Sequence, residues 1–326
     1  MNPTILLVDK FSAERENWKS FLKHHNFDVV STDNEDSARI LCHTRQPDLV
    51  LLHHLPNVRG VDLCRTLKED SLNQLTPVVL VSSRPTPEEL QEGREAGAVD
   101  FWNAPSSVVL CRIESLLRLK AFMDEEAKSV ILSLAHSVES KHSGTDGHSD
   151  RLAEFAIQLG ESLGLSGDEL EQLHLGCLLH DIGKLAVPDF ILLKPGPLNP
   201  EETGIVRRHP VAGERICAPL KCLRPVLPLI RHHHERMDGT GYPDGLVGDE
   251  IPLGARILQI ADVYDALTSD RPYRKALSSS EALEILRQEA MYGWLDAKLV
   301  WKFGSMGLST GPLSLREHSM LASYYT

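Results

Sequence analysis

The first 105 residues alternate short, continuous apolar runs with helical patterns, and this alternation restricts the folds open to the chain. Continuous apolar runs are typical of strands in a parallel sheet that helices cover on both faces. The runs predict strands at 4–8, 27–32, 48–52 and 77–81, with helices at 12–24, 35–43 and 88–96. Gly97 follows the last of these helices and suits the left-handed residue that ends many helices. The predicted fold class is α/β, with a doubly wound parallel sheet.

The remainder of the chain shows helical patterns without β-alternation. Helices are predicted at 149–163, 166–179, 200–217, 254–268 and 279–290. Asn199 followed by Pro200 is a start signal, because Asn caps helices and proline is tolerated at the first helical position. This part is predicted to be an all-α helical bundle.

Residues 108–138 contain no proline or glycine and place apolar residues in an i, i+3, i+4 rhythm. Such a long helix could pair with its copy in a homodimer or pack on its own domain, and the pattern favours neither. At about 150 residues per domain, the chain length predicts two domains. They are expected at 1–119 and 141–303, with a helical linker at 120–140 and a C-terminal tail at 304–326.

The charge balance argues against a long nucleic acid as partner. The chain has 34 Lys+Arg against 46 Asp+Glu, a net charge of -12, which repels phosphate backbones at long range. No run approaches the roughly 18 apolar residues that span a bilayer, and the N-terminus lacks a signal segment. The six cysteines include no C-x-x-C pair, as is typical of buried free thiols in a reducing compartment. We therefore expect a cytoplasmic protein without membrane contact.

Histidine is concentrated in the helical half: nine of the 15 histidines lie between His136 and His234. His180 and Asp181 directly follow an apolar run, where a charged carboxylate is costly unless it is paired or binds a metal. His148, His209, the run at 231–235 and the segment at 260–262 offer further ligands from other helices, and bundles build internal metal sites in this way. Nitrogen and carboxylate ligands without thiolates favour iron, manganese or zinc in a catalytic site.

The N-terminal part resembles a response-regulator receiver domain from Ile5 to about Leu119. The matching segments are the acidic position after 4–8, PDLVLL at 47–52 and GAVDF at 97–101. The functional positions are altered: Lys10 replaces the second acidic residue, His53 stands at the phosphoacceptor and Ala104 at the lysine, leaving only Asp9 and the hydroxyl of Ser82.

Phosphoryl transfer to a receiver needs a nucleophilic aspartate, a magnesium ion held by carboxylates and a lysine. Phosphate transfer to His53 is disfavoured, because the magnesium site is incomplete and Lys10 is expected to add positive charge inside it. We therefore expect a degenerate pseudo-receiver that signals by protein contact or supports dimerisation.

The helical part, from residue 136 to about 303, resembles an HD-GYP domain, a class of metal-dependent phosphodiesterases that open cyclic di-GMP. The matching strings are LLHDIGK at 178–184, KPGPL at 194–198, RHP at 208–210, HHERMDGTGYP at 233–243, IPLGARI at 251–257 and DVYDALTSDRPYR at 262–274. The resemblance implies an HD-superfamily helical bundle and a hydrolase of cyclic di-GMP that yields pGpG, GMP or both.

The resemblance also implies a binuclear metal centre in which a shared hydroxide attacks the phosphodiester. Its ligands would be His148, His180, Asp181, His209, His233, His234 and Asp262, with Asp181 bridging two divalent ions. Iron is the expected metal, with manganese or zinc as alternatives. Lys184 lies three and four residues beyond Asp181 and His180, so we expect it on the same helical face, holding a phosphate oxygen in the transition state.

The loop at 239–243 has two glycines and a proline, which suit a tight turn beside a ligand. Tyr242 could hydrogen-bond to or stack on the substrate, and Arg271 and Arg274 offer guanidinium groups for phosphate or guanine. Arg236 and Asp238 are expected to shape the loop. Other signalling proteins could bind this loop or the pseudo-receiver.

The sequence departs from the family at Gly144, where some members carry a glutamate that binds a third metal and others a tyrosine. His142 also stands where the family often has aspartate, so a two-metal site is the better prediction. His136, His142, His174 and His232 are expected to be bystanders. Two alternatives stay open: a sensor or adaptor that binds cyclic di-GMP without turnover, and a phosphohydrolase of a different nucleotide.

Overall fold

The computed structural model describes residues 2–53, 59–70, 72–82, 84–142, 147–270 and 275–306. The chain divides into two compact units, Met1–Ser133 with Arg215–Pro225 and Leu134–Glu214 with Val226–Thr326. The expected limits of the domains, linker and tail remain predictions.

The first unit contains one sheet of five parallel strands in the order β2-β1-β3-β4-β5. The strands are β1 (Thr4–Val8), β2 (Asp28–Thr32), β3 (Leu49–Leu52), β4 (Val78–Val81) and β5 (Asp100–Trp102). Val8 pairs with Leu52, so β1 and β3 end at the same edge of the sheet. The predicted α/β parallel sheet is confirmed, whereas β5, at three residues, was too short to show as a run.

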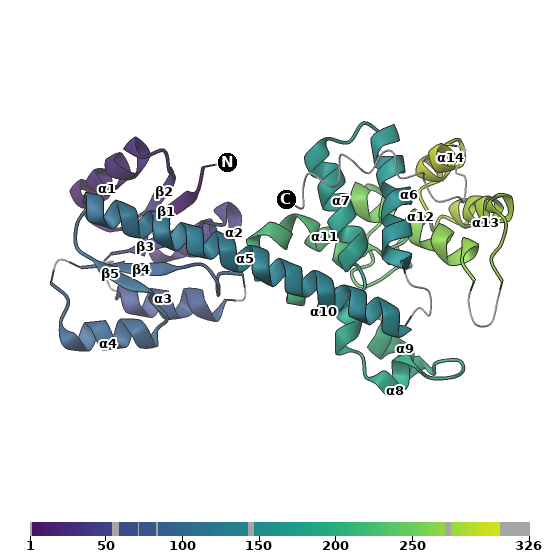
Figure 1. Ribbon diagram of the computed structural model, residues 1–326, viewed down its shortest axis with the longest axis horizontal. Coiled ribbons are helices and arrows are strands. Elements are labelled where there is room, and N and C mark those ends of the chain that lie inside the picture. The colour runs from purple at the N-terminus through teal and green to yellow at the C-terminus, as the bar shows by residue number, and fades with distance from the viewer. Residues whose placement is uncertain are drawn as a thin grey trace. The chain divides into compact units, whose positions relative to one another are not determined.

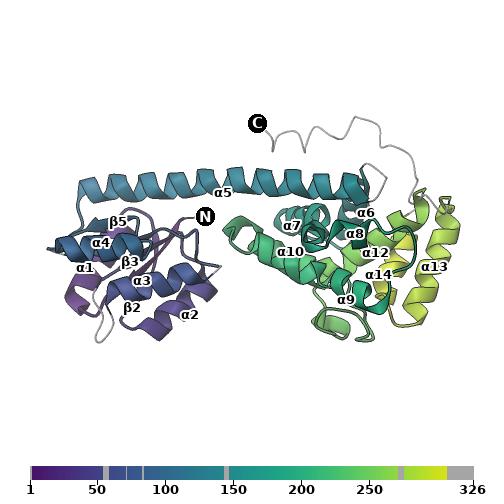
Figure 2. The same ribbon diagram turned by 90° about the horizontal axis from the view of Figure 1, so that it is seen from below.

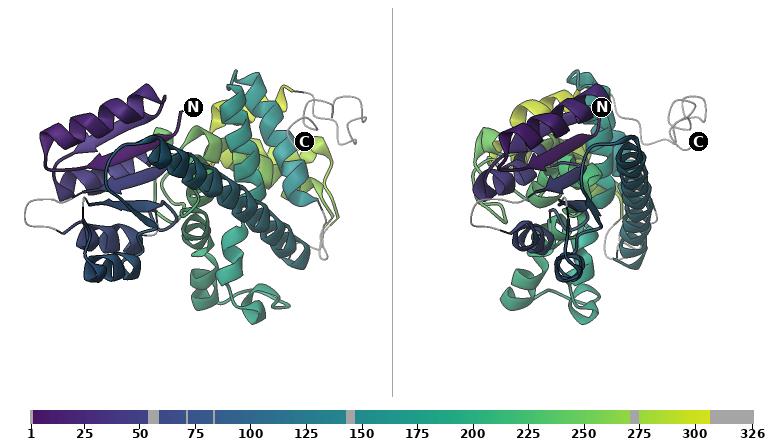
Figure 3. Two further views of the ribbon diagram at one scale, coloured as in Figure 1. Left: turned by 60° about the vertical axis from the view of Figure 1, so that its left-hand side comes forward. Right: turned by 90° about the vertical axis from the view of Figure 1, so that its left-hand side faces the viewer.

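Helices cover both faces of this sheet (Figures 1 and 3). They are α1 (Ser12–His24), α2 (Glu35–Arg45), α3 (Gly60–Glu69), α4 (Pro87–Glu95) and α5 (Ser107–His142). Side chains alternate across a strand. Ile5 and Leu7 of β1 therefore belong to one buried cluster with α1 and α5 residues, and Leu6 and Val8 to another with α2 and α3 residues. The sequence analysis did not predict α3.

The long helix predicted between the halves is continuous, running as α5 from Ser107 to His142 (Figure 2). The division between the two units falls inside it, after Ser133. Its first turns pack on the sheet through Val109 and Ile113. Further along, Leu119, Phe122, Met123 and Val130 are exposed, so α5 is only partly covered by the described residues.

The second unit is helical, which confirms the predicted all-α class. Its helices are α6 (His148–Ser162), α7 (Gly167–Leu179), α8 (Asp189–Leu192), α9 (Pro200–Val206), α10 (His209–Cys217), α11 (Leu227–His232), α12 (Leu253–Thr268), α13 (Ser279–Met291) and α14 (Ala297–Gly304). It also contains the short 3-10 helices η1 (Ile182–Ala186) and η3 (Gly248–Glu250). A further 3-10 helix, η2 (Lys221–Val226), belongs to the first unit except for its last residue. Leu152, Leu173, Tyr264 and Phe303 belong to one fully buried cluster that joins α6, α7, α12 and α14.

The helix predicted at 200–217 is wrong as a single element, because the chain breaks between α9 and α10. Asn199 caps α9 as predicted, in a capping box with Glu202. Pro210 explains the break: proline lacks the backbone N–H that would bond to the carbonyl of Val206, four residues earlier. The break places His209 at the first position of α10.

All six cysteines are free, as expected, but Cys111 and Cys222 are exposed rather than buried. Within the described part of the chain, every helix is too short or too polar to cross a bilayer.

Candidate metal centre

The seven predicted metal ligands come from five helices of the second unit, and most of them lie at helix ends. His148 begins α6, His209 begins α10, and His180 with Asp181 follows the last residue of α7. His233 and His234 follow α11, and Asp262 lies within α12. Helix ends allow the chain to change direction, so these side chains converge.

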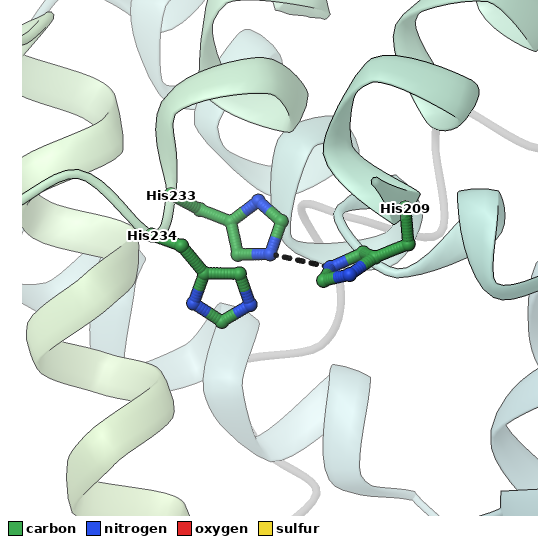
Figure 4. Close-up of side chains that lie close together, drawn as sticks. All are labelled: His209, His233 and His234. Carbon is green, nitrogen blue, oxygen red and sulfur yellow. Dashed lines mark hydrogen bonds between the residues drawn. The ribbon is translucent and has the colours of Figure 1, made fainter. Parts of the chain in front are cut away.

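The histidines and Asp262 form two groups. His148, His180 and Asp262 have ligand atoms within 4.8 Å of one another, and so do His209, His233 and His234 (Figure 4). In the first group, Nε2 of His148 lies 3.4 Å from Oδ1 of Asp262. In the second, Nε2 of His209 lies 3.2 Å from Nε2 of His233.

Asp181 links the two groups. Its Oδ2 lies 3.3 Å from Nε2 of His180, in the first group. Its Oδ1 lies 3.2 Å from Nε2 of His209, in the second. One carboxylate therefore presents one oxygen to each group, the arrangement that a bridging ligand requires.

Backbone carbonyls orient three of the histidines in the same way. Nδ1 of His180 lies 2.8 Å from the carbonyl of Cys177, and Nδ1 of His209 lies 2.9 Å from that of Val206. His233 makes the equivalent bond to Ile230, at 2.8 Å. Because a carbonyl can only accept, Nδ1 carries the hydrogen in each ring, and a neutral ring then directs the lone pair of Nε2 into the cluster.

The second group therefore fits a cation. Burial, followed by the neighbouring imidazoles, holds the pKa of His233 well below its usual value, and the same causes lower the pKa of His234 to about 3. Both rings are thus neutral near pH 7. Nε2 of His233 lies 3.2 Å from Nε2 of His209, and neutral imidazole is a common ligand for divalent transition metals.

The carboxylates of the centre are ionised. Burial opposes a charge on Asp181, but Lys184 and His180 outweigh it and hold its pKa well below the usual value. Burial likewise opposes a charge on Asp262, but its contact with His148 lowers its pKa to about 2. These two negative carboxylates, together with the neutral imidazoles of His233 and His234, form a donor set that suits divalent ions.

Asp265 is a residue of the centre that the sequence analysis did not assign. It is buried, and its Oδ2 lies 2.6 Å from Nδ1 of His148 while its Oδ1 accepts from Nε of Arg151 at 2.7 Å. Burial disfavours a charged His148, but Asp262 and Asp265 outweigh it and raise its pKa to about 10. Asp265 thereby orients His148 toward Asp262. The sequence signal for this role was its position three residues after Asp262, which places both carboxylates on one face of α12.

Lys184 contacts Asp181, as expected, but not because one helix carries both. The helix α7 ends at Leu179, and Lys184 lies in the 3-10 helix η1. Its Nζ donates a short hydrogen bond to Oδ2 of Asp181. The ammonium group thus lies at the bridging carboxylate, where it can also reach a phosphate oxygen.

Gly183 explains how η1 packs beside the centre. A Cβ at this position would lie 1.8 Å from the carbonyl oxygen of His209 and 2.5 Å from the backbone nitrogen of Gly213. Only glycine lets η1 approach α10 this closely. The contact brings the elements that carry Asp181 and His209 together.

The loop at 239–247 is organised by Glu235, which is completely buried. Its carboxylate accepts hydrogen bonds from the backbone N–H groups of Asp244, Gly245 and Leu246, at 2.7 to 3.1 Å. The sequence analysis included Glu235 only in the run at 231–235 that offers metal ligands. It shapes the loop and lies in neither ligand group.

Tyr242 of this loop lies beside the centre. Its ring is 4.8 Å from that of His234, and the guanidinium of Arg207 lies 5.2 Å from the tyrosine ring centroid. A Cβ on Gly241 would lie 2.3 Å from the backbone nitrogen of Arg236, so glycine is needed for the loop to turn here. As expected, Asp238 shapes the loop, accepting from the N–H and hydroxyl of Thr240.

Several predicted residues lie elsewhere. Arg271, Arg274 and Gly144 fall outside the described residues, and so does the side chain of His142. His232 contacts Asp244 at 3.0 Å, outside both ligand groups. His136 and His174 are absent from these groups too.

In the first unit, Asp9 and His53 lie together, with Nδ1 of His53 3.1 Å from Oδ1 of Asp9. Ser82 follows β4 and donates its backbone N–H to Trp102, and Ala104 follows β5 and is exposed. Lys10 is exposed, and its ammonium lies 4.7 Å from the ring centroid of Phe11.

Comparisons with known proteins cover both units. A family model described as an HD domain matches residues 133–299, and one described as a response regulator receiver domain matches residues 5–108. The chain is 34% identical over 271 residues to "Cyclic di-GMP phosphodiesterase response regulator RpfG" of Xanthomonas campestris pv. campestris, covering 75% of this chain and 72% of the relative.

A "Cyclic di-GMP phosphodiesterase" of Thermotoga maritima is 30% identical over 314 residues, covering 86% and 84% of the two chains. The chain belongs to the HD-GYP family. Its helical unit is the HD domain, a type of domain that binds divalent metal, and the sheet of the first unit is a receiver domain. A further relative, "3'3'-cGAMP-specific phosphodiesterase 1" of Vibrio cholerae, is 41% identical over 175 residues, covering 54% of this chain and 41% of the relative.

Proposed function

We propose that this chain is a phosphodiesterase that hydrolyses cyclic di-GMP at a centre of two divalent ions. One observation carries the proposal: the two oxygens of Asp181 reach one ligand group each, at 3.3 Å from His180 and 3.2 Å from His209. His148, His180 and Asp262 would hold one ion, and His209, His233 and His234 the other, with Asp181 shared. Iron is the proposed metal, with manganese and zinc as alternatives.

Bound ions would neutralise charge on the phosphodiester and lower the pKa of a water molecule. The chain's own groups then position the substrate. Lys184 contacts Asp181 and has its ammonium at the centre, so we assign it to a phosphate oxygen on which charge develops. Tyr242, next to His234, would stack on or hydrogen-bond to a guanine base, and we keep Arg271 and Arg274 as proposed phosphate or guanine contacts.

The nucleotide is proposed from the relatives' names, and a second candidate comes from the same source. The two relatives that match three quarters or more of this chain act by name on cyclic di-GMP. The Vibrio cholerae relative at 41% identity, which matches 54% of this chain, acts by name on 3'3'-cGAMP. The two substrates differ in one base. Initial rates on both, measured with one preparation, would rank them.

The activity test uses full-length protein purified anaerobically, with its metal content measured. Incubation with cyclic di-GMP, followed by chromatography, should show pGpG or GMP accumulating as substrate disappears. Lys184→Ala should retain the metal and lose most turnover, and Lys298→Ala, an exposed lysine on α14, should match wild type. Metal-loaded protein that binds cyclic di-GMP but leaves it intact would overturn the proposal and support the sensor or adaptor alternative.

We propose that the receiver domain does not take part in aspartyl phosphotransfer, because His53 stands where a nucleophilic carboxylate is required. The receiver domain would instead act by binding other signalling proteins. The loop at 239–243 is a second proposed contact for such proteins. The cytoplasm stays the proposed location.

A homodimer through α5 is also proposed. Leu119, Phe122, Met123 and Val130 are 53–62% exposed and share one side of the helix, with Glu126 among them. An antiparallel pair centred on Leu119 places Arg112 opposite Glu126 of the second copy, because 112 and 126 are equally distant from 119. A parallel pair would instead place like charges together.

The dimer test is Leu119→Glu, which should shift light-scattering mass from dimer to monomer. Ile40→Glu, at an apolar α2 residue that is 61% exposed, should leave it unchanged. A monomeric wild-type chain would refute the dimer.

A further inference from the structure

A second group of metal-ligating side chains lies in the receiver domain, away from the centre described above. Asp9 directly follows β1 and His53 directly follows β3, and these strands are neighbours that end together at Val8 and Leu52. Glu14 lies in the first turn of α1. The parallel sheet therefore brings one imidazole and two carboxylates to one edge.

The distances within this group match those between ligands of one ion. Nδ1 of His53 lies 3.1 Å from Oδ1 of Asp9 and 3.3 Å from Oε2 of Glu14. Two ligand atoms that each lie about 2.1 Å from an ion at tetrahedral or octahedral angles are about 3.0–3.4 Å apart. Ligand atoms of all three side chains lie within 4.8 Å of one another.

Burial and hydrogen bonding hold two of these ligands in place. The side chain of Asp9 is 1% exposed and that of His53 is 11% exposed, whereas Glu14 is 58% exposed. The backbone N–H of Phe11 donates to Oδ1 of Asp9 at 2.8 Å, which fixes its carboxylate. Two fixed inner ligands and one outer ligand leave a route by which an ion can enter.

Lys10 contacts Phe11, whose ring lies beside that of His53. The ammonium of Lys10 lies over the ring of Phe11, 4.7 Å from its centroid, and it forms no ion pair with a carboxylate of the described residues. The expectation that Lys10 places charge inside the site stays a prediction. The carboxylates of Asp9 and Glu14 face an imidazole and remain available to a cation.

The donor set selects the class of ion. Magnesium prefers oxygen ligands in octahedral geometry, whereas imidazole suits zinc, iron, nickel and copper. A cavity of about 450 Å³ borders the group and is lined, among the described residues, by His53, Glu14, Ser82, Asn103 and other side chains. It has room for the water molecules that would complete the coordination of a metal with three protein ligands.

We infer that the receiver domain binds one first-row transition-metal ion through Asp9, Glu14 and His53. The site does not fit the magnesium-dependent phosphotransfer for which receiver domains are built. Binding would tie the start of α1 to the ends of β1 and β3, so the domain would respond to metal availability. This inference is independent of the phosphodiesterase proposal.

The test counts zinc ions bound to the full chain by equilibrium dialysis and mass spectrometry. His53→Ala should bind one ion fewer than wild type, whereas His43→Ala, an exposed histidine paired with Asp70, should match wild type. Glu14→Gln, at an exposed position that folding tolerates, should weaken one site at least tenfold. Millimolar magnesium should not displace the ion.

A variant that lacks ligands of the metal centre in the helical unit distinguishes metal binding there from metal binding in the receiver domain. His180→Ala combined with His209→Ala should still bind the one ion that His53→Ala removes. Equal zinc counts in wild type and His53→Ala would overturn the inference. Unchanged zinc affinity in Glu14→Gln would also contradict the three-ligand site.

Discussion

Oδ2 of Asp265 lies 2.6 Å from Nδ1 of His148, a residue 117 positions away in the sequence. This contact joins α12 to the start of α6 at the metal centre. A carboxylate behind a metal-binding histidine sets the orientation of the ring and raises its basicity. Asp265 is thus a positioning residue.

Asp265→Asn should lower the metal affinity of the His148 group by about 10–100-fold, the usual effect of losing such a partner. The measurement is metal content at limiting free metal, where the variant should retain fewer ions than wild type. Asp150→Asn, an exposed residue of α6, is the control and should show no loss. Equal metal retention in both variants would refute the positioning role.

Gly183→Ala should destabilise the helical unit by about 2–3 kcal/mol, because the added Cβ overlaps backbone atoms that cannot move independently. The closest of these is the carbonyl oxygen of His209, at 1.8 Å. Gly204→Ala is a matched control within α9, because nothing lies within 4 Å of its added Cβ. Chemical denaturation should show the first variant unfolding at lower denaturant and the second unchanged or slightly stabilised. The same midpoint in both would contradict the close packing of η1 on α10.

Glu235→Gln should weaken the loop that carries Tyr242. A glutamine has one acceptor oxygen in place of two, so the three backbone N–H groups bound by Glu235 can no longer all be satisfied. Leaving one of them unpaired costs about 1–3 kcal/mol. We expect a higher KM for cyclic di-GMP with metal content unchanged, and Glu154→Gln on the exposed side of α6 as the silent control. A normal KM would show that the loop does not contact substrate.

Lys184→Ala should lower kcat by about 10²–10³-fold, the usual cost of losing a group that stabilises charge in the transition state. Lys184→Arg should recover part of this activity, since it restores the positive charge. Lys184 also contacts Asp181, so its loss could lower kcat by releasing a metal ion. Metal analysis of the same samples separates this effect from a direct loss of transition-state stabilisation. A lost ion in Lys184→Ala would reassign Lys184 to the integrity of the centre.

Much of the fold followed from local pattern. The helix at Ser12–His24 and the strand at Thr4–Val8 were predicted to the residue, because the helical periodicity and the apolar run are both clear there. The break before α10 was not foreseen, since the periodicity continues through it and only Pro210 interrupts the backbone hydrogen bonds. Strand β5 is three residues long, shorter than a pattern can resolve.

The metal centre could be predicted only in part. The family resemblance named seven candidate ligands, and the structure brings them together. The hydrogen bonds from Nδ1 of His180 and His233 to backbone carbonyls, however, leave no trace in residue type. Asp265 was within a recognised string, yet only the packing of α12 against α6 reveals its partner. Glu14 carried no signal, because its role depends on strands that end beside it.

The metal content of Asp181→Asn tests the central claim most directly. If Asp181 bridges two ions, anaerobically purified wild type should hold two ions per chain, and Asp181→Asn should lose at least one of them together with cyclic di-GMP turnover. Asp168→Asn, in the exposed first turn of α7, controls for the substitution itself. Two ions and normal turnover in Asp181→Asn would contradict the bridging role and the account built on it.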